Sequence, residues 1–94
     1  MQNKQIVIDT GEQEFTFNVT GQAYNKYINS TTPTNKIQPA TNFLLAAVED
    51  EQKKALKTLL QQPGAALFML GTLIEDYQPE FNFSVKKSKS EPSK

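Results

Sequence analysis

The sequence predicts an α+β fold in which a small antiparallel sheet packs on three to four helices. Three observations lead to this prediction. Apolar and polar residues alternate near the N-terminus, which is the period of a strand with one buried face. Apolar residues then recur at helical spacing through most of the remaining chain. The length of 94 residues is that of one domain with a thin core, which we place at residues 1–86.

The N-terminal residues predict a β-hairpin. Residues 4–9 (KQIVID) are rich in β-branched side chains, and residues 14–19 (EFTFNV) alternate apolar with polar. Residues 9–12 (DTGE) between them are turn formers, and Gly11 is free to adopt a positive φ. Because an isolated hairpin is marginally stable in water, we expect its apolar face to pack on helices. That face carries Phe15, Phe17 and Val19.

Two helical regions are predicted next. Thr20 suits the N-cap of a short helix over residues 21–29, which is followed by a loop over residues 29–39 with two prolines. Pro39 fits the first turn of the following helical region, residues 40–61. The acids at 49–51 interrupt its apolar stripe, so one bent helix and two consecutive helices are both compatible with the pattern. In the second case Asp50 is a candidate cap. The apolar stripe consists of Leu45, Val48, Leu56, Leu59 and Leu60, with Lys53, Lys54 and Lys57 opposite.

Residues 63–79 (PGAALFMLGTLIEDYQP) form the least polar stretch of the chain. The stretch is too short for a membrane span, which needs about 20 apolar residues, and it contains Glu75 and Asp76. We therefore predict a soluble-protein helix that begins at Pro63–Gly64. On a helical wheel its wide apolar side carries Ala66, Leu67, Met69, Leu70, Leu73, Ile74 and Tyr77.

The opposite side of this helix places Phe68 among the small residues Gly64, Gly71 and Thr72. Two interpretations compete for this side. Phe68 either packs inside the same domain, or it anchors a surface for a partner, with the small residues allowing close approach. We favour the core interpretation, because a domain of this size needs most of its large apolar side chains inside. The candidate partner-binding residues are Gly64, Phe68, Gly71 and Thr72.

The end of the chain divides into two parts. Residues 80–86 (EFNFSVK) alternate apolar with polar, which predicts a strand that joins the hairpin as a third member. Residues 87–94 (KSKSEPSK) contain only charged residues, serines and a proline, which predicts a disordered Lys/Ser-rich tail.

The composition excludes several classes of function. The net charge is zero and there is no Arg, which argues against a nucleic-acid-binding face. The tyrosine pair Tyr24 and Tyr27 is therefore better interpreted as the edge of the core than as a base-stacking platform. The chain also has no His and no Cys. It thus lacks the commonest general base and a thiolate metal site, and we expect no enzyme and no cofactor.

Two further expectations come from charge and from the N-terminus. The acids at 49–51 invite comparison with a Ca²⁺ or Mg²⁺ site, but no loop of alternating oxygen ligands with a turn glycine accompanies them. We favour the interpretation that acids mark the beginning of a helix. Residues 1–9 contain no apolar core of signal-peptide length, so we expect a cytoplasmic protein.

Three runs of the sequence resemble a known family. They are AYNKYIN (23–29), NKIQPATNFLLAAVEDEQKKALKTLL (35–60) and PGAALFMLGTLIEDYQPEFNFSVKK (63–87). A short N-terminal β element followed by Y-N-x-Y, P-A-x-N-F-L and P-G-A-A stretches is similar to a group of phage tail assembly chaperones. The resemblance covers roughly residues 19–87. These stretches are structural rather than catalytic, so no functional residue is transferred from them.

The resemblance implies a phage or prophage protein that acts in the bacterial cytoplasm and is absent from the mature virion. Such chaperones coat the long, helical tape-measure protein and recruit tail-tube subunits. Many are also made in a longer form by ribosomal frameshifting, and Lys86–Lys87 is compatible with a slippery run of codons. The alternative is a structural virion protein, or a homo-oligomeric protein-binding module without a chaperone role.

Overall fold

The structure is a computed structural model that describes residues 3–77 and 84–86. Within these residues, a two-stranded sheet is followed by four α-helices and one short 3₁₀ helix, which confirms the predicted α+β class. The elements in chain order are β1 (Lys4–Asp9), β2 (Glu14–Val19), α1 (Gly21–Ser30), α2 (Ile37–Ala47), η1 (Asp50–Gln52), α3 (Lys53–Leu59) and α4 (Ala65–Tyr77).

The predicted hairpin is present. β1 and β2 are antiparallel, with Ile6 opposite Phe17 and Asp9 opposite Glu14. Gly11 has a φ of 92°, and its backbone N–H donates to the Asp9 carboxylate at 2.8 Å, so the turn uses glycine as expected. The apolar face of β2 is fully covered, since Phe15, Phe17 and Val19 are all buried.

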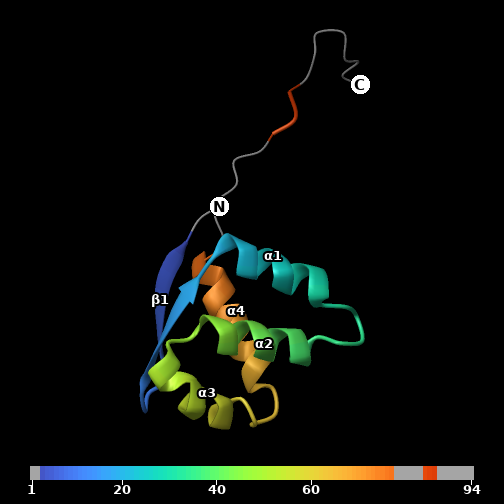
Figure 1. Cartoon of the computed structure of the whole chain (residues 1–94). Helices are drawn as coiled ribbons and strands as arrows, with labels where there is room; N and C mark the ends of the chain where they lie inside the picture. The colour runs from blue at the N-terminus through green and yellow to red at the C-terminus, as the bar shows by residue number, and fades with distance from the viewer. Residues whose placement is uncertain (1–2, 78–83, 87–94) are drawn as a thin grey trace.

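The helices cover one face of the hairpin and enclose a single core (Figure 1). Each helix contributes its apolar side to this core, as the helical spacing predicts. The most deeply buried large side chains are those of Phe17, Leu44, Leu56, Leu73 and Val19.

The first two helices begin close to where the sequence predicts. The Thr20 hydroxyl accepts a hydrogen bond from the Ala23 backbone N–H at 3.1 Å, which is the expected N-cap. α2 begins at Ile37, three residues before the predicted start, and Pro39 lies in its first turn. There the missing proline N–H has no helical partner to lose.

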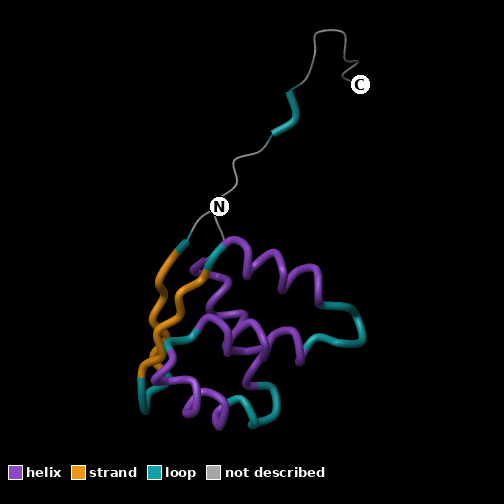
Figure 2. The backbone as a smooth tube through the Cα atoms, viewed as in Figure 1, coloured by secondary structure: helices purple, strands orange, loops and turns teal. Residues whose placement is uncertain are grey.

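Of the two patterns allowed for residues 40–61, the structure has two consecutive helices. α2 ends because Val48 is extended and bridges Phe17 of β2, while the Glu49 N–H donates to the Thr16 carbonyl at 3.0 Å. Figure 2 shows the loop after α2 running to the hairpin. Asp50 is the first residue of η1 rather than its cap, since Glu49 holds the N-cap position.

Gln52 completes the pairing of β2 on the side away from β1. Its side-chain carbonyl accepts from the Thr16 N–H at 2.7 Å, and its amide donates to the Glu14 carbonyl at 3.0 Å. Together with Glu49, this side chain satisfies backbone groups that a third strand would otherwise take.

The predicted third strand is not supported. The part of it that the structure describes, residues 84–86, is exposed and has no regular secondary structure. Residues 80–83 and the predicted tail at 87–94 lie outside the described residues.

Candidate partner-binding surface

The candidate surface lies on α4, whose beginning is set by a glycine turn. Gly64 has a φ of 81°, a conformation that side chains disfavour, and its carbonyl accepts from the Phe68 N–H at 3.0 Å. Gly64 therefore starts α4 for a backbone reason. The backbone conformation alone therefore accounts for glycine at position 64, without any contact with a partner.

The predicted apolar side of α4 packs into the core. Leu73 is fully buried, and the Tyr77 ring meets the Tyr24 ring of α1 with 5.3 Å between centroids. The other buried residues of α4 are Ala66, Met69 and Leu70.

The opposite side of α4 faces solvent, and this corrects the prediction for Phe68. We favoured the core for this residue, but its side chain is 80% exposed. The physical reason is that α4 packs on the core with its other side, which carries Met69, Leu70 and Leu73. Gly64, Gly71 and Thr72 are exposed as well, so all four candidate residues share one open surface, hereafter the α4 face.

Gly71 and Thr72 differ in what the domain requires of them. A Cβ atom built on Gly71 would meet no atom within 4 Å, so no internal contact requires glycine at this position. The Thr72 hydroxyl donates to the Phe68 carbonyl at 3.1 Å within the helix. Among the small residues of the α4 face, Gly71 is therefore the one whose small size is not required by a contact or a backbone conformation within the domain.

Two hollows flank the α4 face. Near its beginning, Gly64 and Leu67 line a hollow together with Ile37 of α2. Ile37 is 58% exposed and Leu67 39% exposed, so this hollow carries exposed aliphatic side chains. The wheel assigned Leu67 to the buried side, and the structure places it at the margin.

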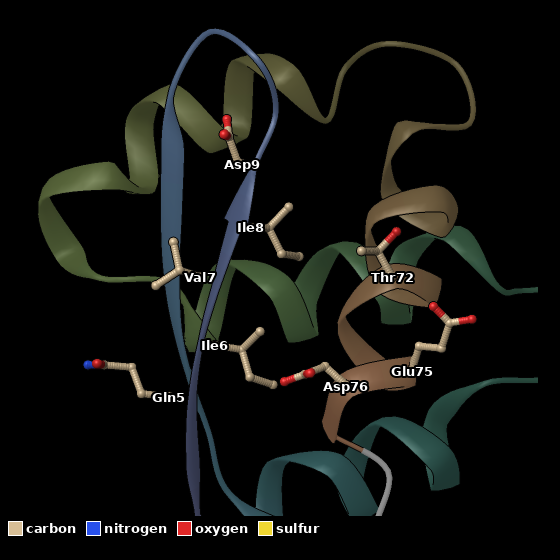
Figure 3. Close-up of a pocket in the computed structure, with 8 residues that line it drawn as sticks. All are labelled: Gln5, Ile6, Val7, Ile8, Asp9, Thr72, Glu75 and Asp76. Carbon is tan, nitrogen blue, oxygen red and sulfur yellow. The ribbon is translucent and has the colours of Figure 1, made fainter.

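The second hollow is a groove between β1 and α4, and Figure 3 shows the side chains that line it. Thr72 joins this groove to the α4 face. Asp76, one of the lining residues, is held by Lys4, whose ammonium group lies 3.2 Å from the Asp76 carboxylate and donates to the Asp76 carbonyl at 2.9 Å. The lining residues are Gln5, Ile6, Val7, Ile8, Asp9, Thr72, Glu75 and Asp76. Sequence periodicity does not reveal this groove, since its walls are more than 60 residues apart.

The tyrosine pair and the acids at 49–51, which the sequence analysis also considered as binding sites, make contacts within the domain. The Tyr27 ring packs on the Phe43 ring with 5.6 Å between centroids, and Tyr24 packs on Tyr77, which fits the core-edge interpretation. Asp50 lies 3.7 Å from the Lys53 ammonium one turn later, as expected of acids at a helix start. Among residues 3–77 and 84–86, no three metal-ligating side chains are grouped together.

No helix in the described part of the chain is long and apolar enough to cross a membrane. Separately, the surface around α4 carries an exposed aromatic side chain, with a hollow lined by aliphatic side chains near the beginning of the helix and a groove lined by acids beside β1.

Comparison with known proteins identifies the family. The sequence model described as "Phage tail assembly chaperone" matches residues 6–87, which is most of the chain. A protein of Haemophilus phage HP1 (strain HP1c1), described as "Uncharacterized 11.3 kDa protein in lys 3'region", is 31% identical over 81 residues. This alignment covers 86% of the present chain and 79% of the phage protein. No solved structure matches. The chain belongs to the phage tail assembly chaperone family.

Proposed function

We propose that this protein binds the tape-measure protein of a phage or prophage tail through the α4 face, and that it brings tail-tube subunits to the growing assembly. The observation that carries the proposal is the exposure of Phe68, with exposed Leu67 and Ile37 in a hollow near the beginning of the same helix. A large aromatic side chain held in solvent by a folded helix adds nothing to the core. It is the kind of anchor that protein interfaces use at their centres.

The chemistry of the α4 face suits a helical partner. An amphipathic helix binds by laying its apolar stripe against an apolar groove, with anchors at helical spacing. Open space over Gly71 lets a partner backbone approach closely beside Phe68. The tape-measure protein of the family is long and helical, so its apolar stripes need cover before the tail tube encloses them.

Binding alone accounts for this role, without catalysis and without a cofactor. The protein acts in the bacterial cytoplasm and leaves the tail before the virion matures. A frameshift-extended form of the same chain is a further partner that we propose, since many chaperones of this kind are also made in a longer form.

Capture of the tagged chain, expressed from its own locus, tests the proposal. Mass spectrometry of the co-purifying proteins is expected to recover a very long, helix-rich protein and the tail-tube protein from the same gene cluster. The tag alone, expressed at the same level, is the control. Recovery of the chain in purified mature particles would instead support the structural virion alternative and contradict the chaperone role.

A further inference from the structure

The outer edge of β1 presents backbone groups without strand partners. Thr16 of β2 directs its N–H and C=O away from β1, toward Gln52 and Glu49. Val7 lies opposite Thr16, so the two form a non-hydrogen-bonded pair, and the Val7 N–H and C=O also point outward. The two-residue period of a strand gives Gln5 the same orientation. Within residues 3–77 and 84–86, no strand pairs with this edge.

The two edges of the hairpin thus differ in their hydrogen bonding. Gln52 and Glu49 occupy the outer edge of β2, whereas β1 has no comparable cover in the described part of the chain. Proteins usually shield open edges, because such edges pair with other chains. An open edge beside a groove is the arrangement that accepts an added strand.

The groove beside this edge favours an apolar, basic strand. Ile6 and Ile8 point toward α4 in Figure 3. Ile6 is buried in the core, whereas Ile8 is only partly buried and offers an apolar contact beside the edge. Asp9, Glu75 and Asp76 line the groove, and Lys4 pairs with Asp76, so the negative charge of the groove rests mainly on Asp9 and Glu75. An occupant with alternating apolar residues and positive charge would complement both features.

The C-terminal part of the chain has this chemistry. Residues 80–86 alternate, with Phe81, Phe83 and Val85 at every second position, and lysines follow at 86, 87 and 89. Val85 is 82% exposed, so it finds no cover in its own domain. The family match extends to residue 87, ten residues beyond α4, so this stretch belongs to the shared domain unit.

We propose that residues 80–86 of a second copy add to the outer edge of β1 as a third strand. A second copy is favoured over the same chain because residues 84–86 are exposed and unpaired with β1 in the single chain. Each copy offers one edge and one strand, so the contact is head-to-tail and joins copies into an open chain or a closed ring. Of the α4 face only Thr72 also lines this groove, and Phe68 does not, so failure of this inference leaves the proposed function intact.

Sedimentation velocity of the full chain over a range of concentrations tests the inference. The wild-type chain is expected to self-associate. Val7→Pro removes the outward N–H while leaving the β1–β2 hydrogen bonds in place, since edge strands tolerate proline at such positions. It is expected to weaken association by about tenfold or more, so that the variant is monomeric at concentrations where the wild type associates. Val7→Thr, which keeps the N–H, is the matched control and is expected to associate like the wild type.

A second variant removes the strand instead of the edge. The double substitution Phe81→Asp and Phe83→Asp is also expected to be monomeric, and this result does not depend on the folding of Val7→Pro. Mixing the two monomeric variants is expected to give a one-to-one pair that does not grow, because one complete edge and one complete strand remain.

Two results would overturn the inference. The wild-type chain could stay monomeric, or the double variant could associate as strongly as the wild type. If the wild-type chain is monomeric, protection of the amides of residues 80–86 from hydrogen exchange that Val7→Pro removes would mean that the strand docks on its own β1.

Discussion

The structure describes four phenylalanines, and they divide sharply between two environments. Phe15, Phe17 and Phe43 are buried in the core, whereas Phe68 is 80% exposed. The sequence alone could not predict which phenylalanines are buried, because both sides of α4 carry apolar or small residues. A helical wheel does not show which side of a helix is covered by the rest of the domain. Exposure of the second side depends on contacts between distant parts of the chain. We therefore expect these residues to differ in energetic role.

Substitution to alanine tests that difference. Phe17→Ala is expected to lower the free energy of unfolding by about 3–5 kcal/mol, because it leaves a cavity in the core. Phe68→Ala is expected to change it by less than about 0.5 kcal/mol, as is usual for surface positions. Urea denaturation followed by circular dichroism measures both values. A loss of about 3 kcal/mol for Phe68→Ala would show that this residue is part of the core.

Substitution by alanine is expected to have opposite effects on stability at the two glycines of the α4 region. Gly71 lies inside a helix with open space around its Cα, so Gly71→Ala is expected to stabilise the protein by up to about 1 kcal/mol. Gly64 has a positive φ, and Gly64→Ala is expected to destabilise the protein by about 1 kcal/mol or more. Thermal unfolding distinguishes them, since 1 kcal/mol corresponds to about 4–8 °C in a domain of this size. Equal effects of the two substitutions would contradict the assignment.

At the scale of the elements, local patterns were informative and long-range contacts were not. Alternation around Gly11 predicted the hairpin, and Thr20 marked the beginning of α1, because a turn and a cap are formed by residues adjacent in sequence. The pattern left residues 40–61 open between one helix and two, since the break follows from pairing with a strand about 30 residues earlier. The third strand was predicted from alternation alone, and the described residues 84–86 do not support it.

The sequence analysis did not predict the role of Gln52 at the edge of β2, because no residue near Gln52 in the sequence indicates it. Its side chain bonds the backbone of β2 at residues 36 and 38 positions away. Gln52→Ala leaves the Thr16 N–H without this partner, and we expect a loss of about 1–3 kcal/mol in the free energy of unfolding. Amide hydrogen exchange should become faster at Thr16. Gln22→Ala, on the exposed side of α1, is the control, and equal small effects of both substitutions would contradict this role for Gln52.

At the scale of the whole molecule, the helices face the hairpin with their apolar sides, and within residues 3–77 and 84–86 we propose two surfaces for other chains. One is the α4 face, which is apolar and helical, and the other is the open edge of β1. The sequence identified the residues of the α4 face but favoured the wrong environment for Phe68. It carried no sign of the β1–α4 groove, which forms only when the two ends of the domain meet at Lys4 and Asp76. A small module with separate surfaces for a partner and for itself suits assembly along a long protein.

The measurement that tests the central claim most directly is the capture of the tape-measure protein by a chain carrying Phe68→Glu. Circular dichroism and thermal unfolding first establish that the variant is folded. The variant is then expected to retain about one tenth or less of the tape-measure protein that the wild type captures, because a charge replaces the anchor of the interface. Ile28→Glu, at an exposed apolar residue on α1, is the matched control and is expected to capture as much as the wild type. Undiminished capture by the folded Phe68→Glu variant would contradict the assignment of the α4 face as the binding surface.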